Sequence, residues 1–216
     1  MSMIQFEKLG IFLSKPVAFL LVIIYLVQSM LLIYLVRDKF LLEEQITHQQ
    51  KIVEDLEEQL QIFNAIKDFQ IGFNDKEIGD LANVIYEESD RYHYDPMFVL
   101  AIILTESSFI KGQKSYVGAR GLMQVVPFVG KDLANRSGVE WKGTETLYDV
   151  EKNIKLGTLH LFEQILEFGN IEKALVAYNM GETRVRGMLR RNNELPDRYL
   201  NKVLENYKML KENYSV

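Results

Sequence analysis

The sequence predicts a mainly α protein in which a membrane-spanning helix and a helical stalk precede one globular domain. Three observations predict this class. Val17–Val36 is apolar, residues 38–70 contain neither Gly nor Pro, and the rest of the chain repeats apolar residues at helical spacing. With 216 residues, 48% of them hydrophobic and 25% charged, the chain has room for one domain and an appendage.

Residues 1–37 are expected to form a cytoplasmic leader and a transmembrane anchor. Val17–Val36 carries no formal charge, and at about 1.5 Å per residue such a helix spans the roughly 30 Å core of a bilayer. A cleaved signal peptide would have a shorter apolar run and a small-residue cleavage site, so a retained anchor is favoured. The basic residues on the two sides of the span balance and do not orient it: Lys8 and Lys15 against Arg37 and Lys39.

Residues 38–73 are expected to form the helical stalk. Its apolar positions are spaced alternately four and three residues apart, which is a heptad pattern of about three repeats. Two interpretations stay open: a parallel homodimer through this seam, or a single amphipathic helix that folds back on its own domain. The seam consists of Leu42, Ile46, Gln49, Val53, Leu56, Leu60 and Phe63.

Residues 74–216 are expected to form an all-helical domain with its own core. Asn74 or Asp75 can cap its first helix, and Asp149 can start a long helix that ends at Gly169. Shorter helices are expected over residues 171–178, 183–189 and 196–210, each with apolar residues on one face.

Glu106 is the leading candidate for a catalytic acid. It follows an apolar helix that Asp95 and Pro96 can begin and that has no polar face from Met97 to Leu104. Such a helix must be buried. Apolar neighbours and the negative end of the helix dipole both disfavour the ionised form of a carboxyl group at its C-terminal end. The pKa of Glu106 is therefore expected to be raised, as a general acid near neutral pH requires.

The loop after Glu106 cannot supply a second carboxylate. No Asp or Glu occurs from Ser107 to Lys131, whereas Ser115 and Gln124 offer neutral hydrogen-bonding groups. Glycines at 112, 118 and 121 let the backbone turn and approach a ligand closely.

Composition excludes several other classes of function. The chain has no cysteine, which removes disulfides and thiolate metal sites, and its three histidines lack metal-ligand spacing. A net charge of −5 does not indicate a nucleic-acid binder. We therefore expect no metal, no cofactor and no nucleic-acid partner.

Four motifs in order resemble those of the family 1 lytic transglycosylases, the soluble-lytic-transglycosylase type with a goose-lysozyme-like fold. The resemblance covers roughly residues 74–212. The motifs are Glu106-Ser107, Ser115 with residues 118–124 (Gly-Ala-Arg-Gly-Leu-Met-Gln) and Pro127, residues 177–181 (Ala-Tyr-Asn-Met-Gly), and residues 195–200 (Leu-Pro-Asp-Arg-Tyr-Leu). Met180, Glu182 and Val125-Val126 depart from the usual family residues.

The resemblance implies cleavage of the β-1,4 bond between N-acetylmuramic acid and N-acetylglucosamine in peptidoglycan, with formation of a 1,6-anhydromuramoyl end. It assigns the acid and base roles to Glu106 alone, with the substrate acetamido group stabilising positive charge at C1. By the same resemblance, Ser115 contacts that acetamido group and Gln124 contacts the glycan. Tyr178, Asn179 and Tyr199 line the cleft and hold Glu106.

Two other functions remain as alternatives. A goose-type lysozyme would hydrolyse the same bond and would need a second acid such as Asp132, Asp149 or Glu182 near the cleft. A catalytically silent scaffold would bind glycan and gather cell-envelope machinery, but it has no reason to keep Glu106. Because the substrate lies outside the cytoplasmic membrane, we expect a single-pass protein of the inner membrane with its domain on the periplasmic or wall side.

Overall fold

The computed structural model describes residues 3–6 and 11–214, and it divides the chain between Asp55 and Leu56 into two compact units. The first unit contains a short antiparallel hairpin that the sequence did not predict, because four-residue strands are too short to show alternation. Its strands are β1 (Met3–Phe6) and β2 (Ile11–Ser14). Lys8, used above in the charge balance, lies outside the described residues.

Helix α1 (Lys15–Phe69) runs without interruption through the predicted span and stalk. Its N-terminal part is long and apolar enough to cross a membrane, and that apolar window is not buried against the described residues. The uninterrupted helix agrees with the absence of Gly and Pro between residues 38 and 70.

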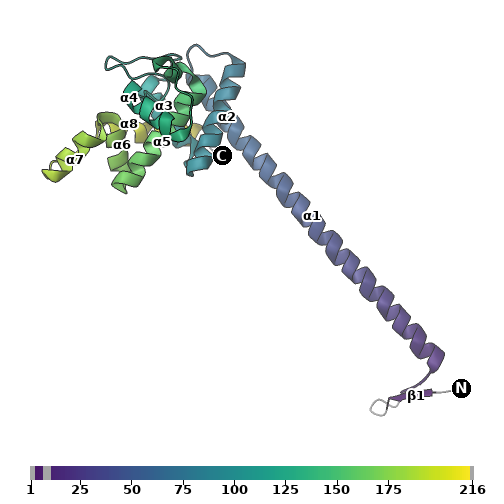
Figure 1. Ribbon diagram of the computed structural model, residues 1–216. Coiled ribbons are helices and arrows are strands. Elements are labelled where there is room, and N and C mark those ends of the chain that lie inside the picture. Colours follow the sequence, from purple (N-terminus) through teal and green to yellow (C-terminus); the bar gives the residue numbers. More distant parts are fainter. Residues whose placement is uncertain (1–2, 7–10, 215–216) are drawn as a thin grey trace. The chain divides into compact units, whose positions relative to one another are not determined.

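The second unit is helical, which confirms the predicted fold class. Figure 1 labels its helices in chain order. They are α2 (Asp75–Tyr92), α3 (Pro96–Ser107), α4 (Pro127–Ser137), the 3₁₀ helix η1 (Thr144–Tyr148), α5 (Val150–Phe168), α6 (Ile171–Met180), α7 (Glu182–Arg190) and α8 (Arg198–Tyr214).

Side-chain caps fix the helix starts that the sequence predicted. Asn74 and Glu77 form a reciprocal capping box, in which each side chain accepts the backbone N–H of the other at 3.0 and 3.1 Å. Asp95 accepts the N–H of Met97 at 2.9 Å, and Asp149 accepts that of Lys152 at 3.1 Å. Helix α3 ends just after Glu106, where Ser108 adopts the left-handed conformation with a φ of 51°.

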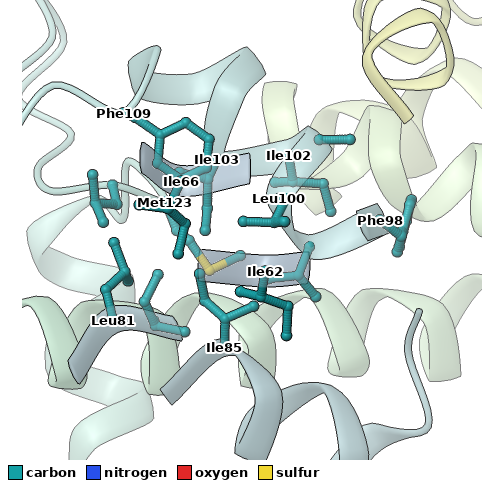
Figure 2. Packing of buried hydrophobic residues seen from close by; sticks show 14 of the residues in the cluster. Ile62, Ile66, Leu81, Ile85, Phe98, Leu100, Ile102, Ile103, Phe109 and Met123 are labelled. Atoms are coloured by element: carbon teal, nitrogen blue, oxygen red, sulfur yellow. The ribbon is translucent and has the colours of Figure 1, made fainter. Parts of the chain in front are cut away.

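Helix α3 is the centre of the core. Every residue from Pro96 to Ile103 is buried, as its uniformly apolar sequence predicted, and α3 packs against α2 and α8 while α5 packs against α2 and α6. Figure 2 shows Leu100 and Ile103 of α3 grouped with Ile85 of α2 and Met123 of the following loop.

The last turns of α1 also belong to this core. Ile62, Ala65 and Ile66 are fully buried, and Figure 2 shows Ile62 and Ile66 among the side chains of α2 and α3. The compact unit accordingly starts at Leu56, within the segment that the sequence assigned to the stalk. Sequence patterning placed the domain start at residue 74 because the helix continues without a breaker until Gly72.

Candidate active site

Glu106 lies in the last turn of α3 and opens onto a pocket of about 430 Å³ between α3, α6 and the start of α8. Glu106 is the only acidic residue among the described residues that line this pocket. The other lining residues are Thr105, Val176, Asn179, Pro196, Arg198, Tyr199 and Lys202.

The environment of Glu106 favours the protonated form of its carboxyl group. Burial raises its pKa to about 7, against the opposing effects of a hydrogen bond from Tyr199 and the positive charge of Lys202. Tyr199 Oη donates to Glu106 Oε1 at 2.6 Å, which fixes the orientation of the carboxyl group. Such a group can both donate and accept a proton near pH 7.

Helix α6 brings Tyr178 and Asn179 to the same region. Asn179 lines the pocket, whereas Tyr178 Oη donates to the backbone carbonyl of Met123 at 2.8 Å. The pKa of Tyr178 is raised well above its usual value, first by burial and then by the charge of Glu106. Tyr178 therefore ties α6 to the loop near Glu106, and Tyr199 holds the carboxyl group directly.

Ser115 and Gln124 hold the shape of the loop that follows α3. Ser115 Oγ accepts the N–H of Ala119 at 3.1 Å. Gln124 has a positive φ of 47°, and its Nε2 donates to the carbonyls of Gly121 at 2.7 Å and Gln113 at 3.2 Å. Neither side chain is among the described residues that line the Glu106 pocket.

Asn153 of α5 anchors this loop, and the sequence analysis missed it. Its fully buried side chain accepts the N–H of Met123 at 2.8 Å and donates to the carbonyls of Arg120 at 2.9 Å and Leu147 at 3.0 Å. A Cβ on Gly121, whose φ is +77°, would lie 2.3 Å from Asn153 Nδ2. Only glycine therefore fits at 121.

Two cations beside Glu106 were also missed. Arg198 and Lys202 line the pocket from α8. A sequence signal was available for Lys202, because a residue three positions after Tyr199 lies on the same side of a helix. No sequence signal marked Asn153, whose role depends on a loop distant in the chain.

The acids that a hydrolase would need are engaged elsewhere. Asp132 pairs with Arg136 at 2.9 Å, and Asp149 caps α5 and pairs with Lys152 at 3.4 Å. Glu182 pairs with Arg186 at 2.7 Å. None of the three is among the described residues that line the Glu106 pocket.

Solved structures and curated proteins resemble this chain over its helical domain. The fold matches that of an inactive Glu-to-Gln mutant of the lytic transglycosylase Slt from Pseudomonas aeruginosa, with a TM-score of 0.53 and 26% identity over 60% of this chain and 24% of that one.

Among sequences, the transglycosylase of Enterobacteria phage PRD1 is 37% identical over 93 residues, which are 43% of this chain and 32% of that protein. The membrane-bound lytic murein transglycosylase C of Actinobacillus pleuropneumoniae serotype 5b is 38% identical over 80 residues, 36% of this chain and 22% of that protein. The match thus spans a third or less of the length of these curated relatives.

The model of the transglycosylase SLT domain matches residues 83–201, which include Glu106 and the other residues that line its pocket except Lys202. This stretch is more than half of the 216-residue chain. It also includes all four motifs named above. The chain therefore belongs to the transglycosylase SLT domain family.

Proposed function

We propose that this protein is a peptidoglycan lytic transglycosylase that cleaves the β-1,4 bond between N-acetylmuramic acid and N-acetylglucosamine. The observation that carries the proposal is Glu106, a carboxyl group with a pKa raised to about 7 that opens onto a pocket without a second acid among the described residues. Family membership and the named lytic transglycosylase relatives support the same activity.

The proposed reaction uses Glu106 twice and consumes no water. Protonated Glu106 donates its proton to the glycosidic oxygen as the C1–O bond breaks, and the N-acetylglucosamine side leaves as an alcohol. The substrate acetamido group stabilises the positive charge at C1. The Glu106 carboxylate then takes the proton of the muramoyl C6 hydroxyl as O6 bonds to C1. The product is a 1,6-anhydro end, and Glu106 returns to its protonated form.

The remaining site residues are proposed to position substrate and acid. Tyr199 orients Glu106 through the 2.6 Å hydrogen bond, and Asn179 reaches the glycan from the pocket wall. Ser115 accepts the Ala119 N–H, so its hydroxyl hydrogen remains able to donate to the acetamido oxygen. Gln124 keeps the loop in place and offers its Oε1 to the glycan. Tyr178 positions α6 against the loop.

The ion pairs formed by Asp132, Asp149 and Glu182 argue against a goose-type lysozyme. A hydrolase that inverts or retains configuration uses two carboxyl groups flanking one bond. Asp132, Asp149 and Glu182 each pair with a cation away from the pocket, so none has the position of a water-activating base.

We further propose a single-pass anchor in the cytoplasmic membrane, with residues 1–37 as leader and span, 38–73 as a stalk whose last turns pack into the domain core, and 74–216 as catalytic domain on the periplasmic or wall side. The apolar part of α1 and the membrane-bound relatives support anchoring. Protease added outside cells with an intact inner membrane is expected to digest the domain and not the leader.

Mass analysis of the products from purified peptidoglycan tests the activity. Wild-type protein is expected to release muropeptides with anhydro ends, and Glu106→Gln is expected to release none while its circular dichroism is unchanged. Products with reducing ends would establish a lysozyme instead. Undiminished anhydro release by Glu106→Gln would refute the role of Glu106.

A further inference from the structure

Helix α1 carries an apolar seam over residues 42–60 whose apolar side chains are largely exposed. Its apolar members are between 45% and 58% exposed, whereas soluble helices normally bury such a stripe. The seam residues recur at alternating intervals of four and three: Leu42, Ile46, Gln49, Val53, Leu56 and Leu60.

The heptad register of this seam points to a particular partner. Its spacing places Ile46 and Val53 at a positions and Leu42 and Leu56 at d positions. β-Branched residues at a combined with Leu at d favour parallel two-stranded coiled coils. The polar Gln49 at a d position costs stability but disfavours other registers.

The flanking positions do not oppose such a pairing. In a parallel pair, a g residue of one helix faces the e residue of the next heptad on its partner. Here Gln45 would face Gln50, and Ile52 would face Glu57. Neither pair brings like charges together.

The seam as far as Leu60 lies on another side of α1 than Ile62 and Ile66, which make the core contact. A helix advances about 100° per residue, which places Leu60 about 160° from Ile62 and about 120° from Ile66 around the axis. Ile62 and Ile66 are fully buried in the core, while Leu56 and Leu60 each remain 58% exposed in the same compact unit. Phe63 packs against the core, so the exposed seam ends at Leu60.

We propose that a second copy of this chain covers the seam, so that residues 42–60 of two chains form a parallel two-stranded coiled coil beside the membrane. Both interpretations of the stalk then apply, to different parts of it. The last turns of α1 fold onto the domain, and the seam over residues 42–60 pairs with the second copy. Two chains anchored in the same membrane have their α1 helices pointing in the same direction. The parallel arrangement therefore rests on the proposed membrane anchor, and it does not depend on the proposed reaction. Anchoring in a membrane also raises the effective concentration of one chain around another, which favours pairing through so short a seam.

The absence of cysteine in the wild-type chain makes crosslinking a direct test. The full chain in membranes would carry Leu56→Cys at a seam position or, as the matched control, Lys51→Cys on the outer face of the same helix. Both sites are solvent-exposed in the monomer. After mild oxidation, Leu56→Cys is expected to give at least about tenfold more disulfide-linked dimer than Lys51→Cys, since disulfides need Cα atoms roughly 4.4–6.8 Å apart. Equal yields, or no dimer from Leu56→Cys, would overturn the proposal.

A second variant separates a specific seam from collisions in the membrane. Val53→Glu, added to Leu56→Cys, puts two carboxylates at facing a positions and is expected to remove the crosslink. A crosslink that persists in this double variant counts against the coiled coil. Release of anhydro muropeptides is measured on the same membranes, so loss of catalysis and loss of dimerisation are read separately.

Discussion

Two glutamates in this domain, one buried and one partly buried, have raised pKa values, and only the partly buried one has the surroundings of a catalyst. Glu88, on α2, is 2% exposed, pairs with Arg91 at 3.2 Å and accepts a hydrogen bond from Thr158 of α5 at 3.4 Å. Glu106 instead opens onto a pocket and accepts a short hydrogen bond from Tyr199. Burial is the largest cause of the raised pKa in both. Desolvation therefore prepares a proton donor, but access for a substrate decides whether it is used.

The largest expected difference between the two glutamates is in activity. Glu106→Gln should lower anhydro-muropeptide release by about 10²–10⁴-fold or more, because the variant has no proton to donate. Glu88→Gln keeps the shape of a residue outside the pocket and should retain activity within a few-fold. Initial rates on purified peptidoglycan check this. Equal losses of activity in Glu106→Gln and Glu88→Gln would show that the pocket gives Glu106 no special role.

Both glutamates should make the domain less stable as pH rises. Between the ordinary pKa of 4.5 and about 7, folded Glu106 binds more protons than unfolded Glu106, so the free energy of unfolding falls with rising pH through that window. The loss is at most about 3 kcal/mol. Glu106→Gln should flatten this slope, and so should Glu88→Gln, whose pKa is raised in the same direction.

Urea unfolding at pH 5 and pH 8, followed through the fluorescence of the single tryptophan, Trp141, measures this slope. Trp141 packs against the core and reports on it. An unchanged slope in Glu106→Gln would mean that its carboxyl group titrates alike in the folded and unfolded chain.

Removing the hydroxyl donor of each glutamate sharpens the comparison. Tyr199→Phe deletes a hydrogen bond that lowers the pKa of Glu106, so that pKa should rise. Since Glu106 must start protonated, the alkaline limb of the profile of kcat/KM against pH should move to higher pH. Thr158→Val removes the donor to Glu88 and should leave that limb in place. A shift of the alkaline limb to lower pH in Tyr199→Phe would contradict the assignment of that limb to Glu106.

The smallest expected effect comes from nearby positive charge. Lys202 lowers the pKa of Glu106 by its charge, and Lys155 does the same for Glu88. Lys202→Met should move the alkaline limb upward by less than Tyr199→Phe does, and added salt should reduce the difference from wild type. Lys155→Met should not move it. A shift in Lys155→Met as large as in Lys202→Met would show that the limb does not report Glu106 alone.

Much of the fold could be predicted because its signals are local. Asn74, Asp95 and Asp149 cap helices where their sequence context placed them, and the uniformly apolar run after Pro96 is buried. The domain boundary was harder to predict. Ile62 and Ile66 continue a helix that has no breaker, and their burial depends on α2 and α3, which follow later in the chain.

The site was predictable where one residue carries the chemistry, and less so where distant residues meet. The raised pKa of Glu106 followed from the helix before it, although burial and not the helix dipole is its largest cause. Glu88 was not predicted to be buried, because a single charged residue near an apolar stripe normally faces solvent. The hydrogen bond from Tyr199 joins positions 93 residues apart, and no local pattern encodes it.

The anchoring of the loop by Asn153 limits where this family member can diversify. At Gly121 any side chain collides with Asn153 and with the Leu147 carbonyl, whereas a Cβ at Gly118 would meet nothing within 4 Å and only the φ of +86° opposes a side chain. Tyr116 and Val117, at the exposed tip beside Gly118, are likewise unconstrained by packing. Natural variants and engineered libraries should therefore tolerate substitutions at Tyr116 and Val117, while substitutions at Gly121 should destabilise the folded loop.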